Sequence, residues 1–172
     1  GQAGDSRIYL WRLGELRQLS HDQSPVGRLR ANGQLNEEQA RAHPYRHLID
    51  QCLGGAGAAI EPETGKFPLE PGDIFLLCSD GLSDGLWDRD LAEGLKLAAA
   101  GQSPAEVASI LVARANEASG RDNITAVVAR AAGTYASSST ADHPPEPEGS
   151  PVMRLLRQFG WRRKTTNDTG TP

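Results

Sequence analysis

The five-residue run Ile74–Cys78 (IFLLC) constrains the fold of this chain more than any other feature of its sequence. The run is wholly apolar, it follows a Pro-Gly-Asp turn, and it leads directly into Ser79, Asp80 and Gly81. A run this short between such flanks is typical of a buried strand rather than of a helix. We therefore expect a sheet that contains this strand and an acidic side chain at the point where the strand ends.

The segments around this strand predict an α+β fold. Arg7–Trp11 and Glu15–Leu19 favour two strands joined at Leu13-Gly14, which together predict a hairpin. Four helices are expected after this hairpin, at 24–32, from 37 to Pro44, at 86–99 and at 103–118. A strand at 123–131 is expected to close the folded part. Strands in hairpins and helices in pairs indicate an antiparallel sheet with helices packed outside it.

Two of the expected helices carry capping signals. Asn36 precedes two glutamates and Gln39, and Ser103 precedes Pro104 and Glu106. An Asn or Ser side chain can accept a backbone hydrogen bond at a helix start, and a Gln or Glu three residues later can return one. Both patterns predict a capping box.

The composition changes sharply near residue 133, which divides the chain into three parts. Residues 1–132 are expected to fold, and residues 133–151 are Ser-, Pro- and acid-rich and predict a disordered linker that includes His143. Residues 152–172 form a basic, partly apolar tail. We favour a disordered basic end, and the alternative is an amphipathic helix that contacts an anionic membrane or a partner groove.

Bulk properties exclude several classes of function. A net charge of −4 gives no argument for nucleic-acid binding, and no apolar run is long enough to cross a bilayer. Cys52 and Cys78 stand far apart, so a zinc site or a disulfide framework is not expected. Each cysteine is predicted to be a small buried side chain, in keeping with a cytoplasmic protein. The chain begins without Met, close to its first motif, so we expect a fragment.

Four aspartates form the candidate chemical site. Asp80 follows the Ile74–Cys78 strand, Asp84 lies four residues later, Asp5 precedes the first strand and Asp122 precedes the last. Magnesium and manganese ions prefer carboxylate and water oxygens, which such strand ends can supply. The alternative is that these residues only bond the local backbone in turns, or that Asp84 caps a helix. A calcium loop within 79–90 is a weaker alternative because it lacks a terminal Glu.

Several segments resemble the motifs of the PPM-type (type 2C) metal-dependent protein serine/threonine phosphatases, and they follow one another along the chain in the same order as in that family. The most specific are Leu69–Asp73 with Phe75–Leu82, similar to the family's L-x-x-GD-x-LLL-C-SDGL, and Arg121–Thr125, similar to its closing DNIT. The others are Gly4–Arg7 (GDSR), Ser20–Ser24, Gly33–Arg46 and Leu53-Gly54. Together they indicate the C-terminal part of the family's catalytic domain.

The resemblance implies an α/β/β/α sandwich of antiparallel sheets, present here as an incomplete C-terminal portion. It implies that Asp80 and Asp122 are metal ligands, that Asp5 and Asp84 help to hold a third, looser ion, and that Ser6 and Arg7 are structural. The cofactors would be Mn²⁺ or Mg²⁺, with two or three ions in the complete domain. A metal-activated water would hydrolyse phosphoserine and phosphothreonine in protein substrates, opposite a cognate kinase in signalling.

The sequence departs from the family's pattern in one important respect. The aspartate that bridges two metals lies in a DGHGG-type motif in the family, together with a proposed general-acid His and a phosphate-binding Arg, and this sequence has no counterpart. His21, His43 and His47 belong to other segments and are not expected to replace that His. We therefore expect the isolated chain to be inactive and to bind metal weakly. The alternative function is a non-catalytic, phosphatase-like regulatory or binding module.

Overall fold

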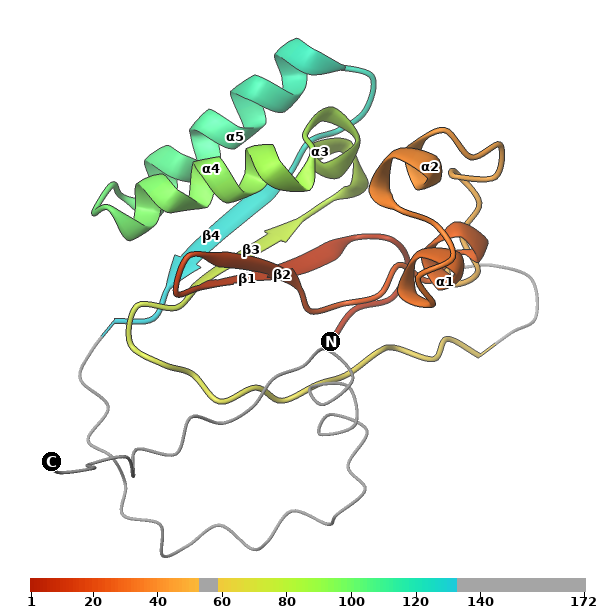
Figure 1. The fold of residues 1–172 in the computed structure, drawn as a ribbon, viewed down its shortest axis with the longest axis horizontal. Helices are drawn as coiled ribbons and strands as arrows, with labels where there is room; N and C mark the ends of the chain where they lie inside the picture. Colours follow the sequence, from red (N-terminus) through yellow and green to blue (C-terminus); the bar gives the residue numbers. More distant parts are fainter. Residues whose placement is uncertain (53–58, 133–172) are drawn as a thin grey trace, which may run out of the picture. The chain divides into compact units, whose positions relative to one another are not determined.

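The computed structural model describes residues 1–52 and 59–132 of the chain (Figure 1). The predictions for the linker at 133–151, for the tail at 152–172 and for Leu53-Gly54 lie outside the described residues. Within the described part, no helix is both long and apolar enough to span a membrane.

Four antiparallel strands form a single sheet in the described part of the chain. They are β1 (Arg7–Arg12), β2 (Glu15–Gln18), β3 (Ile74–Cys78) and β4 (Ala126–Arg130), in the order β2-β1-β3-β4. Arg7 lies opposite Cys78, and Cys78 lies opposite Ala126. The beginnings of β1 and β4 therefore flank the end of β3, and the segments that enter or leave these strands meet at one edge of the sheet.

The predicted hairpin of β1 and β2 is confirmed. Leu13 and Gly14 both have positive φ, 51° and 88°, and Arg12 pairs with Glu15 across the turn. Two central residues with positive φ are the mark of a type I′ turn, whose twist matches that of the flanking strands. Gly14 takes this conformation without steric cost, and Leu13, which is 95% exposed, has no side-chain packing to lose.

Helices α3 (Asp80–Gly85), α4 (Asp88–Ala99) and α5 (Pro104–Ala118) pack on one face of the sheet, as Figure 1 shows. The buried core between these helices and the sheet is continuous. Its largest fully buried side chains include Tyr9, Ile74, Leu76, Leu82, Leu91, Leu95 and Leu111. The shorter helices α1 (Pro25–Ala31) and α2 (Glu37–Arg41) lie beside the end of the sheet where β1 begins (Figure 1).

Both predicted capping boxes are present. The Asn36 side chain accepts the Gln39 N–H at 2.8 Å, and the Gln39 side chain accepts the Asn36 N–H at 2.9 Å. Ser103 Oγ accepts the Glu106 N–H at 3.2 Å, and Glu106 accepts the Ser103 N–H at 3.3 Å. These local patterns therefore set the starts of α2 and α5.

Three expectations require correction. Cys52 is exposed, because it lies in a stretch without regular structure, whereas Cys78 is buried on the helix-covered face of β3. Helix α4 begins at Asp88 rather than at residue 86, because Leu86 and the N-cap Trp87 are extended. Strand β3 is not buried along its whole length, since Leu77 points away from the helices and is 42% exposed.

Candidate metal centre

Two turns that carry aspartates lie against each other at the end of β3. The Ser79 N–H donates to the Thr125 carbonyl at 3.1 Å, the Ser79 hydroxyl donates to the Asn123 carbonyl at 3.1 Å, and the hydroxyl accepts the Thr125 N–H at 3.0 Å. A Cβ on Gly81 would lie 2.6 Å from the Asn123 carbonyl oxygen. Glycine after Asp80 is therefore what allows the turn of Asp122 to approach.

Asp80 and Asp122 make similar local contacts within these turns. Each carboxylate accepts the backbone N–H of the residue that follows, at 2.9 Å for Asp80 and 2.7 Å for Asp122. Such bonds are what an aspartate in an ordinary turn would make. They use one oxygen of each carboxylate, which leaves the second oxygen available to a ligand.

Asp5 reaches the same edge of the sheet from the segment before β1. Its neighbour Gly4 is held by Gln23, whose side chain accepts the Gly4 N–H at 2.8 Å and whose backbone N–H donates to the Gly4 carbonyl at 2.8 Å. The pKa of Asp5 is raised above its ordinary value, mainly by burial and next by the negative charge of Asp80. Asp5 and Asp80 therefore repel each other, and a cation near both would offset that repulsion.

Asp84 lies one helical turn after Asp80 on α3, and its side chain is exposed. Residues four positions apart on a helix share a face, so both carboxylates project from the same side of α3. Asp80 is the first residue of this helix.

The donor chemistry of this edge suits Mg²⁺ or Mn²⁺, because its carboxylates are oxygen ligands. The set is nevertheless incomplete within residues 1–52 and 59–132, where no three His, Cys, Asp or Glu side chains are grouped closely enough to hold an ion. The described residues therefore provide part of a metal centre.

A network of charged side chains behind this edge was missed by the sequence analysis. Arg7 donates to both carboxylate oxygens of Asp22, at 2.7 to 3.1 Å, and to the Tyr9 hydroxyl at 3.1 Å. Tyr9 in turn donates to Asp88 at 3.1 Å, and Arg30 of α1 pairs with the same carboxylate. Burial raises the pKa of Tyr9, so it stays a donor. The network fixes Arg7, two residues after Asp5, to α1 and α4.

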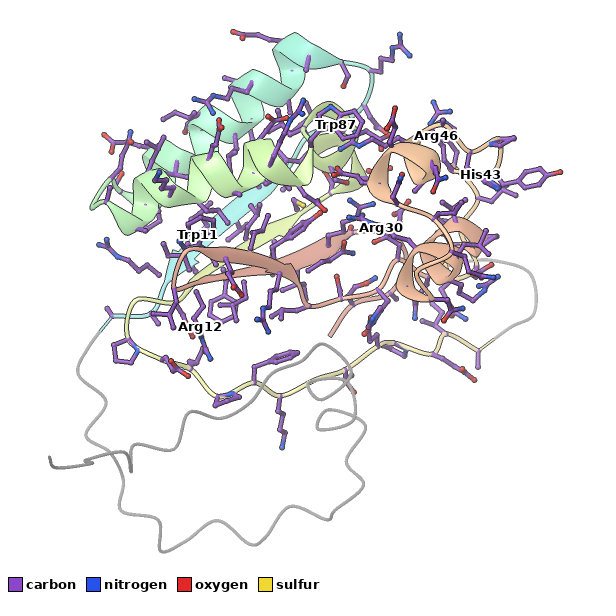
Figure 2. The ribbon with its side chains drawn as sticks, viewed as in Figure 1. Trp11, Arg12, Arg30, His43, Arg46 and Trp87 are labelled. Carbon is purple, nitrogen blue, oxygen red and sulfur yellow. The ribbon has the colours of Figure 1, made fainter. Side chains whose placement is uncertain are left out.

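Within residues 1–52 and 59–132, the contacts of the histidines are with residues other than these four aspartates. His21 Nδ1 lies 2.8 Å from a Glu63 oxygen, and the His21 N–H donates to the other oxygen at 2.7 Å. The His43 ring, labelled in Figure 2, packs against the Tyr45 ring at a tilt of 54°, with ring centroids 5.7 Å apart, on the segment after α2. His47 is exposed on the same segment. These contacts hold loops together.

Comparisons with known proteins place this arrangement in a family. The sequence model described as Stage II sporulation protein E (SpoIIE) matches residues 9–132. Serine/threonine protein phosphatase PstP of Mycobacterium tuberculosis is 41% identical over 126 residues, which are 73% of this chain and 23% of that protein.

Solved structures agree with these sequence matches. The serine/threonine phosphatase of S. agalactiae has a TM-score of 0.64 at 39% identity, covering 74% of this chain and 51% of that one. The catalytic domain of PstP in complex with two manganese ions has a TM-score of 0.60 at 37% identity, covering 74% and 50%. The chain therefore spans about half of each solved chain. Together with the strand-end aspartates, these matches show that the chain belongs to the SpoIIE/PPM-type serine/threonine phosphatase family.

Proposed function

We propose that this chain supplies the C-terminal half of the catalytic domain of a metal-dependent protein serine/threonine phosphatase. The observation that carries the proposal is the meeting of acidic segments at one edge of the sheet. Asp5 enters β1, Asp80 leaves β3, and Asp122 lies just before β4, on three adjacent strands. Antiparallel register brings these ends together although up to 117 residues separate them in sequence.

In this proposal, Asp80 and Asp122 are ligands of the main metal pair, and Asp5 and Asp84 hold a third, looser ion. The ions, Mn²⁺ or Mg²⁺, would lower the pKa of a water and neutralise charge on the phosphoryl oxygens. The chain's own part is to hold the carboxylates rigidly. The bonds of Ser79 to Asn123 and Thr125 fix two of the turns, and those of Gln23 to Gly4 fix the third.

The substrates we propose are proteins that carry phosphoserine or phosphothreonine, phosphorylated by a cognate kinase in a signalling pathway. The relatives named as serine/threonine phosphatases support this class. We also propose a reducing cytoplasm as the compartment, since both cysteines of the chain are free thiols.

The coding sequence upstream of residue 1 tests the proposal. A DGHGG-like motif in frame, in a longer polypeptide that dephosphorylates a phosphothreonine peptide with Mn²⁺, would support it. Asp80→Asn in that polypeptide should abolish turnover, whereas Glu38→Gln on the exposed side of α2 should not. A longer polypeptide without the motif and without turnover would instead favour a non-catalytic binding module.

A further inference from the structure

The C-terminal end of α3 is closed by one backbone bond, from the N–H of the C-cap Leu86 to the Leu82 carbonyl at 2.9 Å, and later carbonyls need other donors. The helix has six residues, and its last turn contains no basic residue. The last carbonyls of a helix have no partner within it, and they carry a partial negative charge that a cation can offset. The carbonyls of Ser83 and Asp84 in the last turn, and that of the extended C-cap Leu86, therefore need donors from elsewhere in the molecule.

Arg41, at the end of α2, supplies all three donors. Its guanidinium donates to the Ser83 carbonyl at 2.6 Å, to the Asp84 carbonyl at 3.0 Å, and to the Leu86 carbonyl. The same group lies 4.3 Å from the centroid of the Trp87 ring, in the geometry of a cation–π contact. The planar five-donor fork of arginine suits such a cluster of acceptors.

Glu37, one turn earlier on α2, holds both Arg41 and the start of α4. Its Oε1 accepts Arg41 Nε at 3.2 Å and Nη2 at 3.1 Å, and it also accepts the Asp88 N–H at 3.0 Å. An acid at the start of a helix and a base at the end of one are both favourable charge placements. Glu37 and Arg41 thus bind the two sides of the α3–α4 junction at once.

We propose that Glu37 and Arg41, which we call the α2 clamp, are positioning residues for Asp84. Arg41 binds the backbone of Asp84 itself and leaves its exposed side chain free to face an ion. The inference rests on the proposed function, in which Asp84 helps to hold the looser metal. Without the clamp, the last turn of α3 loses two hydrogen bonds and its C-cap Leu86 a third, and the Asp84 carboxylate is no longer held in one place.

Manganese binding to the full 172-residue chain tests the clamp, measured by electron paramagnetic resonance of free Mn²⁺. Arg41→Ala and Glu37→Ala should weaken Asp84-dependent binding about tenfold, as is usual when groups that orient a ligand are removed. Glu38→Ala is the matched control, because Glu38 is exposed on the same helix and should leave binding unchanged. Arg41→Lys keeps the charge but not the fork, so it should restore binding only in part.

Two further measurements separate positioning from a general loss of structure. Hydrogen exchange of the Leu82 and Leu86 amides should be at least about tenfold faster in Arg41→Ala, while exchange in β3 stays unchanged. In an Asp84→Asn background, Arg41→Ala should weaken Mn²⁺ binding no further, because the residue through which it acts is gone.

The possible outcomes distinguish a failure of the positioning role of the α2 clamp from a failure of the proposed function. If Arg41→Ala binds Mn²⁺ as tightly as the parent chain, or if its effect persists in Asp84→Asn, the positioning role is overturned. If Asp84→Asn alone leaves Mn²⁺ binding by this chain unchanged, Asp84 holds no ion in this chain and the positioning role is overturned, whereas the roles proposed for Asp80 and Asp122 are untouched. Unchanged exchange of α3 in Arg41→Ala would show that the clamp does not hold the helix at all.

Discussion

At the scale of single residues, the two thiols occupy opposite environments. Cys52 is exposed, and Cys78 is 5% exposed on the core face of β3. Burial raises the pKa of Cys78 to about 12, and the nearby positive charge of Arg7 offsets this only in part. Because the thiolate is the reactive form, Cys78 remains protonated and unreactive at pH 8.

We therefore expect Ellman's reagent to modify one thiol in the native chain at pH 8 and the second only after unfolding in urea. Cys52→Ser should remove the rapid phase and leave the slow one. Rapid modification of Cys78 in the native protein would contradict the buried environment described above.

Asp73 forms the most deeply buried ion pair of the described residues. It is 1% exposed, and it accepts Arg12 Nε at 2.7 Å and Nη2 at 2.5 Å as well as the Glu70 N–H at 2.9 Å (Figure 2). Asp73→Ala leaves the Arg12 guanidinium with only Glu70 and the Pro68 carbonyl as acceptors, which should reduce the free energy of unfolding by about 2–3 kcal/mol. Urea denaturation measures the change.

An exposed pair on the same sheet provides the control for this measurement. Glu15 and Arg17 are 2.9 Å apart but remain 69% and 41% exposed. Glu15→Ala should therefore change the free energy of unfolding by less than about 1 kcal/mol. Equal losses from Asp73→Ala and Glu15→Ala would show that burial does not govern the Arg12–Asp73 pair.

At the scale of helices and strands, what could be predicted from sequence depends on how local the determining contact is. The starts of α2 and α5 follow from capping residues three positions apart, and both were predicted correctly. The start of α4 was placed two residues too early, because the extended conformation of Leu86 and Trp87 is not marked by a local pattern. The bonds that Arg41 makes at this junction come from more than 40 residues earlier in the chain. The one-sided burial of β3 was missed for a similar reason, since five apolar letters do not tell which face the helices cover.

The capping box of α5 gives a prediction at this scale. Ser103→Ala removes the hydroxyl that accepts the Glu106 N–H, and the free energy of unfolding should fall by about 1 kcal/mol. Ser109→Ala on the same helix is the matched control, because its hydroxyl only donates to the Ala105 carbonyl one turn earlier. We expect Ser109→Ala to be neutral within about 0.5 kcal/mol. A loss as large in Ser109→Ala would show that the cap is not the cause.

At the scale of the whole molecule, the candidate site could likewise be predicted only in part from the sequence. The sequence placed Asp5, Asp80 and Asp122 near strand ends, but it did not show that these ends share one edge of the sheet. That follows from the antiparallel register of β1, β3 and β4, which forms only when the chain folds. The charge network of Arg7, Tyr9 and Asp88 was missed because residues from several elements contribute to it, and no short motif contains them.

The architecture also explains why we expect no activity from this chain alone. The described residues form one sheet with helices on one face, while Leu77 and Val127, which pair directly across β3 and β4, are 42% and 53% exposed on the other. The chain spans about half the length of the solved relatives it matches.

We therefore expect the 172-residue chain to release no phosphate above background from a phosphothreonine peptide with Mn²⁺. The physical reason is that its described residues group no three acidic, His or Cys side chains around one point, so too few ligands hold the ions that would activate a water. Colorimetric phosphate release measures this, with the catalytic domain of PstP as the positive control under the same conditions. Turnover by this chain that Asp80→Asn abolishes would contradict the expectation, because it would show that the carboxylates of this half are sufficient for catalysis.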